Sequence, residues 1–391
     1  MKFLLASLGS RGDVEPCAAI GRELQRRGHQ VCMAVPPNFL GFIELAGLPA
    51  VPHGPDHVEQ NASIERVYGK TPHPMMAAYA TLKHLTELLP ELGKSLAWLT
   101  EGADLLLTDA SEQGLAANVA EYYDIPMAAL HIFPLEPGGN DWQVTKEVEE
   151  AQRRTLGLPE EPGPSARPPL EIQAYDELFF PDLAAKWAEH DLRRPFVGGL
   201  TLELPAEADD DVTSWIAAGT PPIYFGFGSS VRLPNAADTL TIISEVCAQL
   251  GERALMCSGS SDFTNVPHFE HVKVVGSVNH TAVFPACRAV VHHGGPGTTF
   301  AGIRAGVPTL AMSVSVDQPL WAGAVTQLEV GRGRPFFEAT QDTLLEDLRA
   351  ILTPRCIART REVAAQMATP AESAAAAADY LEEAVRLGRL G

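Results

Sequence analysis

A glycine-rich turn between two regular segments limits the folds open to this chain. Residues 289–291 form an apolar stretch typical of a buried strand, and His-His-Gly-Gly-Pro-Gly-Thr-Thr at residues 292–299 leads from it into a helical stretch. Such a turn leaves backbone N–H groups that converge on an anion at the positive end of the helix dipole. His293 can add a donor there. The pattern predicts a phosphate or pyrophosphate site, although glycine turns also occur only to allow close packing.

The same succession of strand, turn and helix recurs along most of the chain. An apolar stretch at residues 3–8 ends in Gly-Ser-Arg-Gly-Asp-Val-Glu-Pro at residues 9–16, and the helix that follows stops at Gly28. We expect Pro16 in the first turn of that helix, where its missing N–H is not needed. Alternating strands and helices form a doubly wound parallel sheet, whose ligands lie at the carboxyl ends of the strands.

Apolar segments bounded by glycine and proline predict the remaining elements. Further strands are expected at residues 31–35, 49–52, 104–108, 127–131, 223–227, 254–257, 272–275 and 309–312. Further helices are expected at residues 75–99, 113–123, 235–250, 280–285, 318–328 and 371–387. The alternation fails between residues 135 and 199, where we expect a loop-rich extension with short helices.

The 391 residues are too many for one ordinary core and indicate two domains. We predict one Rossmann-like domain at residues 1–200, an acidic linker at 201–215, a second Rossmann-like domain at 216–365, and a helix at 366–391 that packs back on the first domain. Asp209-Asp210-Asp211 in the linker follow no strand, so we interpret them as a solvated charge run rather than a metal site.

Composition excludes some classes of function. The net charge of -20 argues against a nucleic-acid partner, which needs a basic surface. The six cysteines lack metal-binding spacing, which favours a reducing, cytoplasmic location. The short apolar stretch at the amino terminus is followed at once by charged residues, so it predicts a strand rather than a signal peptide. No stretch approaches the roughly 20 apolar residues of a membrane span.

Several motifs together, in their order and spacing, resemble those of the GT-B glycosyltransferases. The motifs are the turn at residues 9–16, Phe-Gly-Ser-Ser at 227–230, the turn at 292–299, Arg-Ala-Gly-Val-Pro at 304–308 and Asp-Gln-Pro at 317–319. The similarity is to the group that includes vancomycin-type antibiotic, sterol and mycobacterial glycolipid glycosyltransferases, and it extends to about residue 335. It implies an α/β protein of the GT-B class, with two Rossmann-like domains facing each other across a deep cleft.

The resemblance also implies a reaction. A sugar would move, with inversion, from a UDP- or dTDP-linked donor to a hydroxyl of a lipophilic acceptor such as a natural product, a sterol or a glycolipid. Asp13 would be the general base, although aspartate at a helix start is also a preferred capping residue. The implied donor contacts are Ser10, Arg11, Ser229, Ser230, Val278, His293, Gly295, Gly297, Thr298, Asp317 and Gln318.

The acceptor side is less defined. Met75 and Met76 begin an apolar helical face, and Asp109 and His131 follow predicted strands. Each of these residues could line an acceptor pocket or serve the fold alone. We expect His292 to be structural, because alternation along the strand end points it away from its neighbour.

No metal and no other cofactor is expected. Helix N-termini, backbone amides, His293 and Arg11 can neutralise a departing diphosphate without a divalent ion, even though Pro296 removes one amide from the turn. The expected partners are the donor and a hydrophobic acceptor, with weak peripheral membrane contact if that acceptor is a lipid. The expected protein is a monomer or homodimer. A nucleotide-sugar epimerase and a catalytically silent nucleotide-sugar binding protein remain alternatives.

Overall fold

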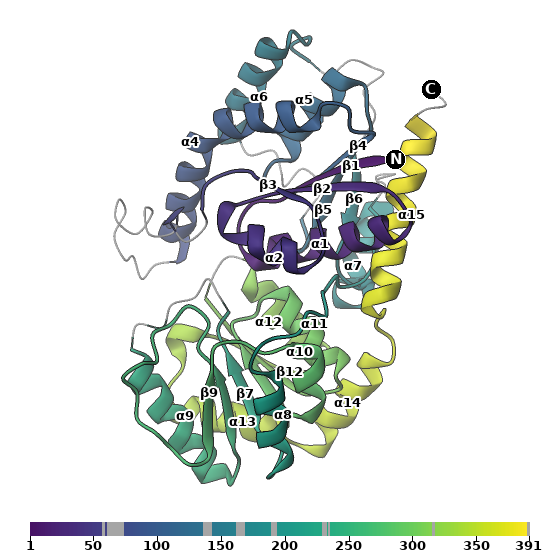
Figure 1. The fold of residues 1–391 in the computed structure, drawn as a ribbon. Coiled ribbons are helices and arrows are strands. Elements are labelled where there is room, and N and C mark those ends of the chain that lie inside the picture. The colour runs from purple at the N-terminus through teal and green to yellow at the C-terminus, as the bar shows by residue number, and fades with distance from the viewer. Residues whose placement is uncertain are drawn as a thin grey trace. The chain divides into compact units, whose positions relative to one another are not determined.

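The structure, a computed structural model, describes residues 1–56, 59–60, 74–135, 143–161, 169–188, 194–228, 233, 235–314 and 317–388. The side chains of residues 74–85, 143, 144 and 188 are outside this description. The chain divides into two compact units (Figure 1). The first unit is Met1–Leu202 with Ala368–Gly391, and the second unit is Glu203–Met367.

A six-stranded parallel sheet in the order β3-β2-β1-β4-β5-β6 forms the first unit. Its strands are β1 (Lys2–Ala6), β2 (Gln30–Val35), β3 (Ala50–Pro52), β4 (Leu105–Asp109), β5 (Met127–His131) and β6 (Leu170–Gln173). Its helices are α1 (Arg11–Arg26), η1 (Pro37–Phe39), α2 (Leu40–Leu45), α4 (Pro74–Thr100), α5 (Gln113–Tyr123), α6 (Gln143–Leu156), η2 (Glu177–Phe179), α7 (Pro181–Ala188) and α15 (Pro370–Gly388).

The central strands of this sheet are buried on both faces, which explains why their sequences are apolar throughout. Leu4 and Ala6 of β1 pack into a cluster with buried leucines of α4 and with α5. Because side chains alternate along a strand, Phe3 and Leu5 turn to the opposite face, and both are fully buried there. The sheet therefore presents its polar groups at the strand ends rather than on its faces.

The second unit repeats this architecture with the strand order β12-β11-β10-β7-β8-β9, again parallel. Its strands are β7 (Ile223–Gly226), β8 (Ala254–Cys257), β9 (Val272–Val275), β10 (Ala289–His292), β11 (Thr309–Ser313) and β12 (Gly331–Pro335). Its helices are α8 (Asp209–Ala217), α9 (Ala236–Leu250), α10 (His280–Val283), η3 (Phe284–Ala286), α11 (Pro296–Arg304), α12 (Gln318–Gln327), η4 (Phe336–Glu338), α13 (Gln341–Ile351) and α14 (Pro354–Ala364). The two parallel sheets confirm the predicted α/β fold.

Two parts of the fold differ from the sequence prediction. Helix α1 begins at Arg11, so Pro16 lies inside the helix rather than in its first turn. Strand β6 and the 14-residue helix α6 occupy the region predicted as loop-rich, because pairing beside β5 supplies order that a short apolar stretch between prolines does not reveal. Within the predicted linker at residues 201–215, the structure has the start of helix α8, whose first turn holds three aspartates at the positive helix end.

The sequence analysis also did not predict β12, α13 and α14 of the second unit. Strand β12 has the sequence Gly-Arg-Gly-Arg-Pro, which carries no apolar alternation, yet it pairs with β11 along five residues. Its position at the edge of the sheet explains the composition, because charged residues and proline discourage further pairing. Helices α13 and α14 follow it and are amphipathic.

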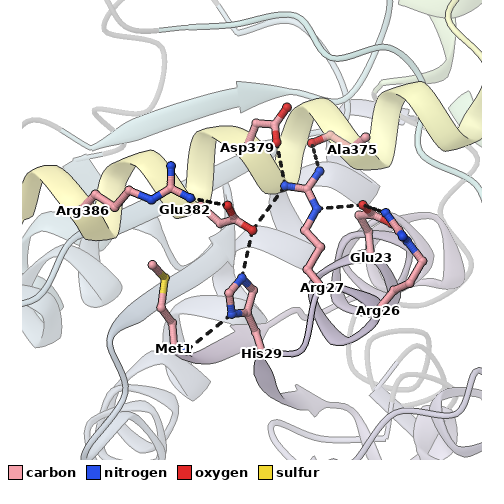
Figure 2. A network of polar contacts seen from close by, with 9 residues as sticks. All are labelled: Met1, Glu23, Arg26, Arg27, His29, Ala375, Asp379, Glu382 and Arg386. Carbon is pink, nitrogen blue, oxygen red and sulfur yellow. Dashed lines mark hydrogen bonds and ion pairs between the residues drawn. The ribbon is translucent and has the colours of Figure 1, made fainter.

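The C-terminal helix α15 belongs to the first unit and packs on α1 (Figure 1). Its buried positions recur every three or four residues and are Ser373, Ala374, Ala377, Ala378, Leu381 and Val385. A network of charges covers this contact (Figure 2): Arg27 donates to Asp379 (2.6 Å) and to Glu382 (3.3 Å), and His29 Nε2 lies 2.9 Å from Glu382. Small residues thus allow close approach, while the polar network fixes the helix in register.

Candidate active site

The glycine-rich turn of the second unit joins β10 to α11. Gly294 has φ +88°, a conformation that favours glycine, and a Cβ there would lie 3.1 Å from Cβ of Gln318. Gly295 is the N-cap of α11, and no side chain caps this helix start. The first amides of a helix have no partner within the helix, and those of Gly297 and Thr298 belong to this group. The turn therefore presents backbone donors at the positive end of a helix, as an anion site requires.

His292 is the last residue of β10 and His293 follows it, but their side chains lie in different environments. His292 is fully buried, and its Nδ1 accepts a hydrogen bond from the Gly294 amide (2.9 Å). Burial lowers the pKa of His292 well below its ordinary value, with the neighbouring histidines acting in the same direction. A neutral ring that orders the turn is a structural role, which agrees with the alternation along the strand.

The ring of His293 lies between two glycines from different loops. A Cβ on Gly295 would lie 2.6 Å from its Nε2, and a Cβ on Gly228, after β7, would lie 2.7 Å from its Cε1. These distances are too short for real contacts, so both glycines are needed for the ring to occupy this place. Burial lowers the pKa of His293 to about 4, and the Gly226 carbonyl opposes that shift. At neutral pH the residue is therefore an uncharged donor or acceptor.

Asp317 and Gln318 lie at the start of α12, next to the glycine turn. Asp317 is the N-cap residue and is half-buried, while Gln318 is 8% exposed. Oε1 of Gln318 accepts from the Val314 amide (2.7 Å), which ties the end of β11 to the helix start. Two motifs 24 residues apart in sequence are thus neighbours at one edge of the second sheet.

The other predicted donor contacts of the second unit are Ser229, Ser230 and Val278. Ser229 and Ser230 lie outside the described residues. Val278 follows β9 and packs against the core beneath α10. The next amide, that of Asn279, donates to Asp209 of α8 (2.8 Å), so a nucleobase at this loop would have to use other backbone groups.

At the corresponding edge of the first unit, Ser10 and Asp13 form a capping box. Oγ of Ser10 accepts from the Gly12 amide (3.1 Å), and Oδ2 of Asp13 accepts from the Ser10 amide (2.7 Å) and hydroxyl (3.0 Å). Gly9, with φ +96°, allows this turn, and a Cβ there would lie 2.6 Å from the same carboxylate oxygen. The structure therefore places Asp13 in the capping role and holds its carboxylate in one orientation at the edge of the sheet.

Arg11 is exposed and is held by its own unit. Its Nε donates to Glu15 (2.7 Å), and its guanidinium lies 4.7 Å from the centre of the Phe42 ring. Glu15 in turn accepts from the Leu202 amide (2.9 Å). The predicted contacts of Ser10 and Arg11 with a donor stay predictions.

Asp109 ends β4 and is 8% exposed. Its Oδ2 accepts from the Leu8 amide (2.7 Å), and its Oδ1 accepts from the amide (2.9 Å) and hydroxyl of Ser111. Burial and the charge of Glu112 raise the pKa of Asp109 to about 6, against the hydrogen bonds from Ser111 and Leu8. A raised pKa of this kind occurs at functional sites and also in buried structural networks of charges.

The structure adds two residues that sequence reasoning missed. His53 Nε2 lies 2.9 and 3.2 Å from the two carboxylate oxygens of Glu112, and its Nδ1 lies 3.1 Å from the Ser95 hydroxyl. The side chains of His53 and Glu112 are completely buried. Burial lowers the pKa of His53, but the Glu112 carboxylate outweighs burial and raises it overall. The sequence does mark both residues by their position after a strand, since His53 directly follows β3 and Glu112 lies three residues after Asp109.

His131, at the end of β5, is 2% exposed. Burial lowers its pKa to about 4, with Glu171 opposing the shift and Arg194 adding to it. Within the described chain its Nε2 has no hydrogen-bond partner.

Met75 and Met76 belong to α4, but their side chains lie outside the described residues. No group of three or more His, Cys, Asp or Glu in the described chain is arranged to hold a metal ion.

Known proteins match both halves of the chain. The glycosyltransferase family 28 N-terminal domain matches residues 3–134, and the erythromycin biosynthesis protein CIII-like C-terminal domain matches residues 231–386. An uncharacterized glycosyltransferase of Mycobacterium tuberculosis is 51% identical over an alignment of 418 positions, which covers 100% of both chains. The vancomycin aglycone glucosyltransferase of Amycolatopsis orientalis is 29% identical and covers 98% of each chain.

Solved structures agree in fold. A calicheamicin glycosyltransferase covers 98% of both chains with a TM-score of 0.75 at 18% identity. A Streptomyces glycosyltransferase complexed with thymidine diphosphate covers 96% of this chain and 98% of its own, with a TM-score of 0.66 at 22% identity. Two parallel-sheet units with these neighbours define the GT-B fold. The chain belongs to the family of glycosyltransferases that combine a family 28 N-terminal domain with an erythromycin biosynthesis protein CIII-like C-terminal domain.

In the described part of the chain, no helix has both the length and the apolar character needed to cross a membrane.

Proposed function

We propose that this glycosyltransferase moves a sugar, with inversion at the anomeric carbon, from a UDP- or dTDP-linked donor to a hydroxyl of a lipophilic small molecule. Natural product aglycones, sterols and glycolipids are the acceptor classes proposed. The observation that carries the proposal is the uncapped start of α11, with His293 fixed beside it between Gly228 and Gly295. A diphosphate is the guest best suited to several convergent amides.

Donor recognition would involve both the turn and the start of α12. The amides of Gly295, Gly297 and Thr298 would bind the diphosphate, with His293 adding a neutral hydrogen bond. Asp317 and Gln318 are adjacent to this turn and would bind sugar hydroxyls. The thymidine diphosphate held by the Streptomyces neighbour supports a nucleoside diphosphate as ligand, and the resemblance to vancomycin-type enzymes supports a hexose.

Asp13 would accept the acceptor proton as the hydroxyl oxygen attacks. A carboxylate has two oxygens and up to four acceptor sites, so capping through Oδ2 is compatible with a second role. The capping box supports this assignment because it orients the group before substrate arrives. A positioned general base contributes about 10²–10⁴-fold to such a step.

The leaving group would need no metal. As the sugar departs, negative charge grows on the diphosphate, and preorganised amides at a helix start can stabilise it. We therefore propose that activity survives chelation of divalent ions by EDTA.

The test begins with a thermal-shift screen of UDP-glucose and dTDP-glucose, followed by product analysis with and without a hydroxyl acceptor. Asp13→Asn should lower turnover by about 10²–10⁴-fold while changing nucleotide-sugar affinity less than about threefold. Asp104→Asn is the matched control, because Asp104 accepts the Lys2 amide at the opposite, amino end of the same sheet. Unchanged turnover in Asp13→Asn would remove the base, and sugar epimerisation without an acceptor would replace transfer by the alternative activity.

A further inference from the structure

The first aspartate of α8 forms hydrogen bonds outside its own helix. Asp209 is half-buried, whereas the next two residues, Asp210 and Asp211, are exposed. Its Oδ2 accepts from the Ala206 amide (2.7 Å), and its Oδ1 accepts from the Asn279 amide (2.8 Å). One carboxylate therefore joins the turn before α8 to the loop between β9 and α10, although Asp209 and Asn279 are 70 positions apart in the sequence.

The loop that Asp209 holds follows β9 at the carboxyl edge of the second sheet. Asn279 is the N-cap of α10, where its side chain accepts from the Thr281 amide (3.0 Å) and its carbonyl accepts from the Val283 amide (3.0 Å). Helix α8 packs against α10 (Figure 1). Burial raises the pKa of the Cys257 thiol, at the end of β8, to about 12, and the charge of Asp209 adds to that shift. The carboxylate therefore lies near the strand ends from which this loop starts.

The two residues before Asn279 have unpaired backbone groups. In the described part of the chain, the amides and carbonyls of Ser277 and Val278 have no hydrogen-bond partner, whereas both backbone groups of Asn279 are bonded. The Val278 side chain packs against a buried cluster to which α8 contributes Val212. Unpaired backbone groups need a partner from solvent or from a ligand. Uracil and thymine each have an N–H between two carbonyl oxygens, so an amide and a carbonyl of one loop can pair with that edge of the base.

We propose that Asp209 is a positioning residue for the nucleotide-sugar donor: its bond to the Asn279 amide fixes the loop of residues 276–279, so that the backbone groups of Ser277 and Val278 are in place for the base of the nucleotide. This inference rests on the proposed UDP- or dTDP-linked donor. A merely stabilising role for the same bond would lower the melting temperature without a selective effect on the base.

Helix α8 contains a matched control for this distinction. Asp211 pairs with Lys273 (2.7 Å), so a second carboxylate of the same helix is tied to the same segment of the chain. Lys273 lies inside β9, whereas Asn279 lies in the loop after that strand. Asp209→Ala and Asp211→Ala each remove one carboxylate that holds this segment, but only the first releases the loop.

The experiment compares Asp209→Ala, Asp209→Asn and Asp211→Ala with wild type in the full-length protein. Hydrogen–deuterium exchange, read by mass spectrometry without any ligand, should be faster at residues 276–279 in Asp209→Ala alone. Calorimetry with UDP and with dTDP should show affinity about tenfold weaker in Asp209→Ala and within about twofold of wild type in Asp211→Ala. Asp209→Asn keeps an acceptor oxygen for the Asn279 amide, so its affinity should stay within about threefold of wild type.

Nuclear magnetic resonance separates the base from the rest of the nucleotide. In saturation-transfer-difference spectra of UDP, the uracil protons should receive less saturation relative to the ribose protons in Asp209→Ala than in wild type. The ratio should be unchanged in Asp211→Ala, because the loop that faces the base keeps its anchor in that variant.

The outcomes separate this inference from the proposed function. Equal losses of affinity in Asp209→Ala and Asp211→Ala, unchanged exchange at residues 276–279, or a weaker affinity with an unchanged saturation ratio would each overturn the positioning role. Failure of the wild type to bind either UDP or dTDP would overturn the proposed donor, and this inference with it. If Asp209→Ala does not fold, Asp209→Ser takes its place with the same expectations, because its shorter side chain cannot join both amides.

Discussion

The carboxyl edges of the two sheets share one backbone architecture but carry opposite chemistry. In the first unit, carboxylates gather where strands end, with Asp13, Asp109 and Glu112 near the ends of β1 and β4. In the second unit, the corresponding edge holds a glycine turn, a neutral histidine and the uncapped start of α11. The first edge is suited to accepting a proton, and the second edge is suited to holding an anion.

The two helix starts make the difference concrete. Helix α1 satisfies its first amides with the side chains of Ser10 and Asp13, which fills the positive helix end with a carboxylate. Helix α11 has Gly295 at the same position and no capping side chain. A strand, turn and helix can thus become a holder for a carboxylate or a site for an external anion, depending on the residue at the N-cap.

The largest effect that would break this comparison is expected at Gly295. In Gly295→Ala, the new Cβ would lie 2.6 Å from Nε2 of His293, so the ring must leave its place beside the turn. We expect at least a tenfold loss of affinity for UDP-glucose or dTDP-glucose, about 1.4 kcal/mol, measured by calorimetry. Gly323→Ala in α12 is the control, because its Cβ would meet no atom within 4 Å. Normal affinity in Gly295→Ala would show that the ring's position does not matter for the donor.

The sequence predicted most of the strands and turns that form these two edges, but it did not predict which side chains pair there. Apolar stretches and glycine turns located most strands of both sheets, because buried parallel strands are apolar on both faces. The capping role of Asp13 and its role as base were both open, since the same residue type serves both. The pairing of His53 with Glu112 could not be predicted, because the two residues are 59 positions apart in the sequence. They come together only through the strand order, in which β3 lies two strands away from β1. Strand β12 was missed because an edge strand needs no apolar pattern.

The protonation state of His293 gives the next test of the second edge. Its pKa of about 4 means that the ring is neutral from pH 6 to 8, so it contributes a hydrogen bond and no charge change in this range. We expect the affinity for UDP-glucose, whose pyrophosphate is a diester without a titration near pH 6, to stay within about twofold between pH 6 and 8 in both wild type and His293→Gln. An affinity that falls about tenfold on passing pH 6.5 in wild type alone would indicate a charged imidazole with an ordinary pKa.

The smallest effect concerns the stability of the first edge, where His131 and Asp109 act in opposite directions. The pKa of His131 is lowered to about 4 in the fold, against about 6.5 when unfolded, so its contribution to stability is present above pH 6.5 and is lost as the pH falls toward 4. The pKa of Asp109 is raised to about 6, so stability instead falls as the pH rises from about 4 to 6. His131→Gln should therefore make the slope of the unfolding free energy against pH more negative, by at most about 1.4 kcal/mol per pH unit. Asp109→Asn should make the same slope more positive. Urea unfolding at pH 5 and 7 measures both slopes, and a shift of the same sign in the two variants would contradict the opposed titrations.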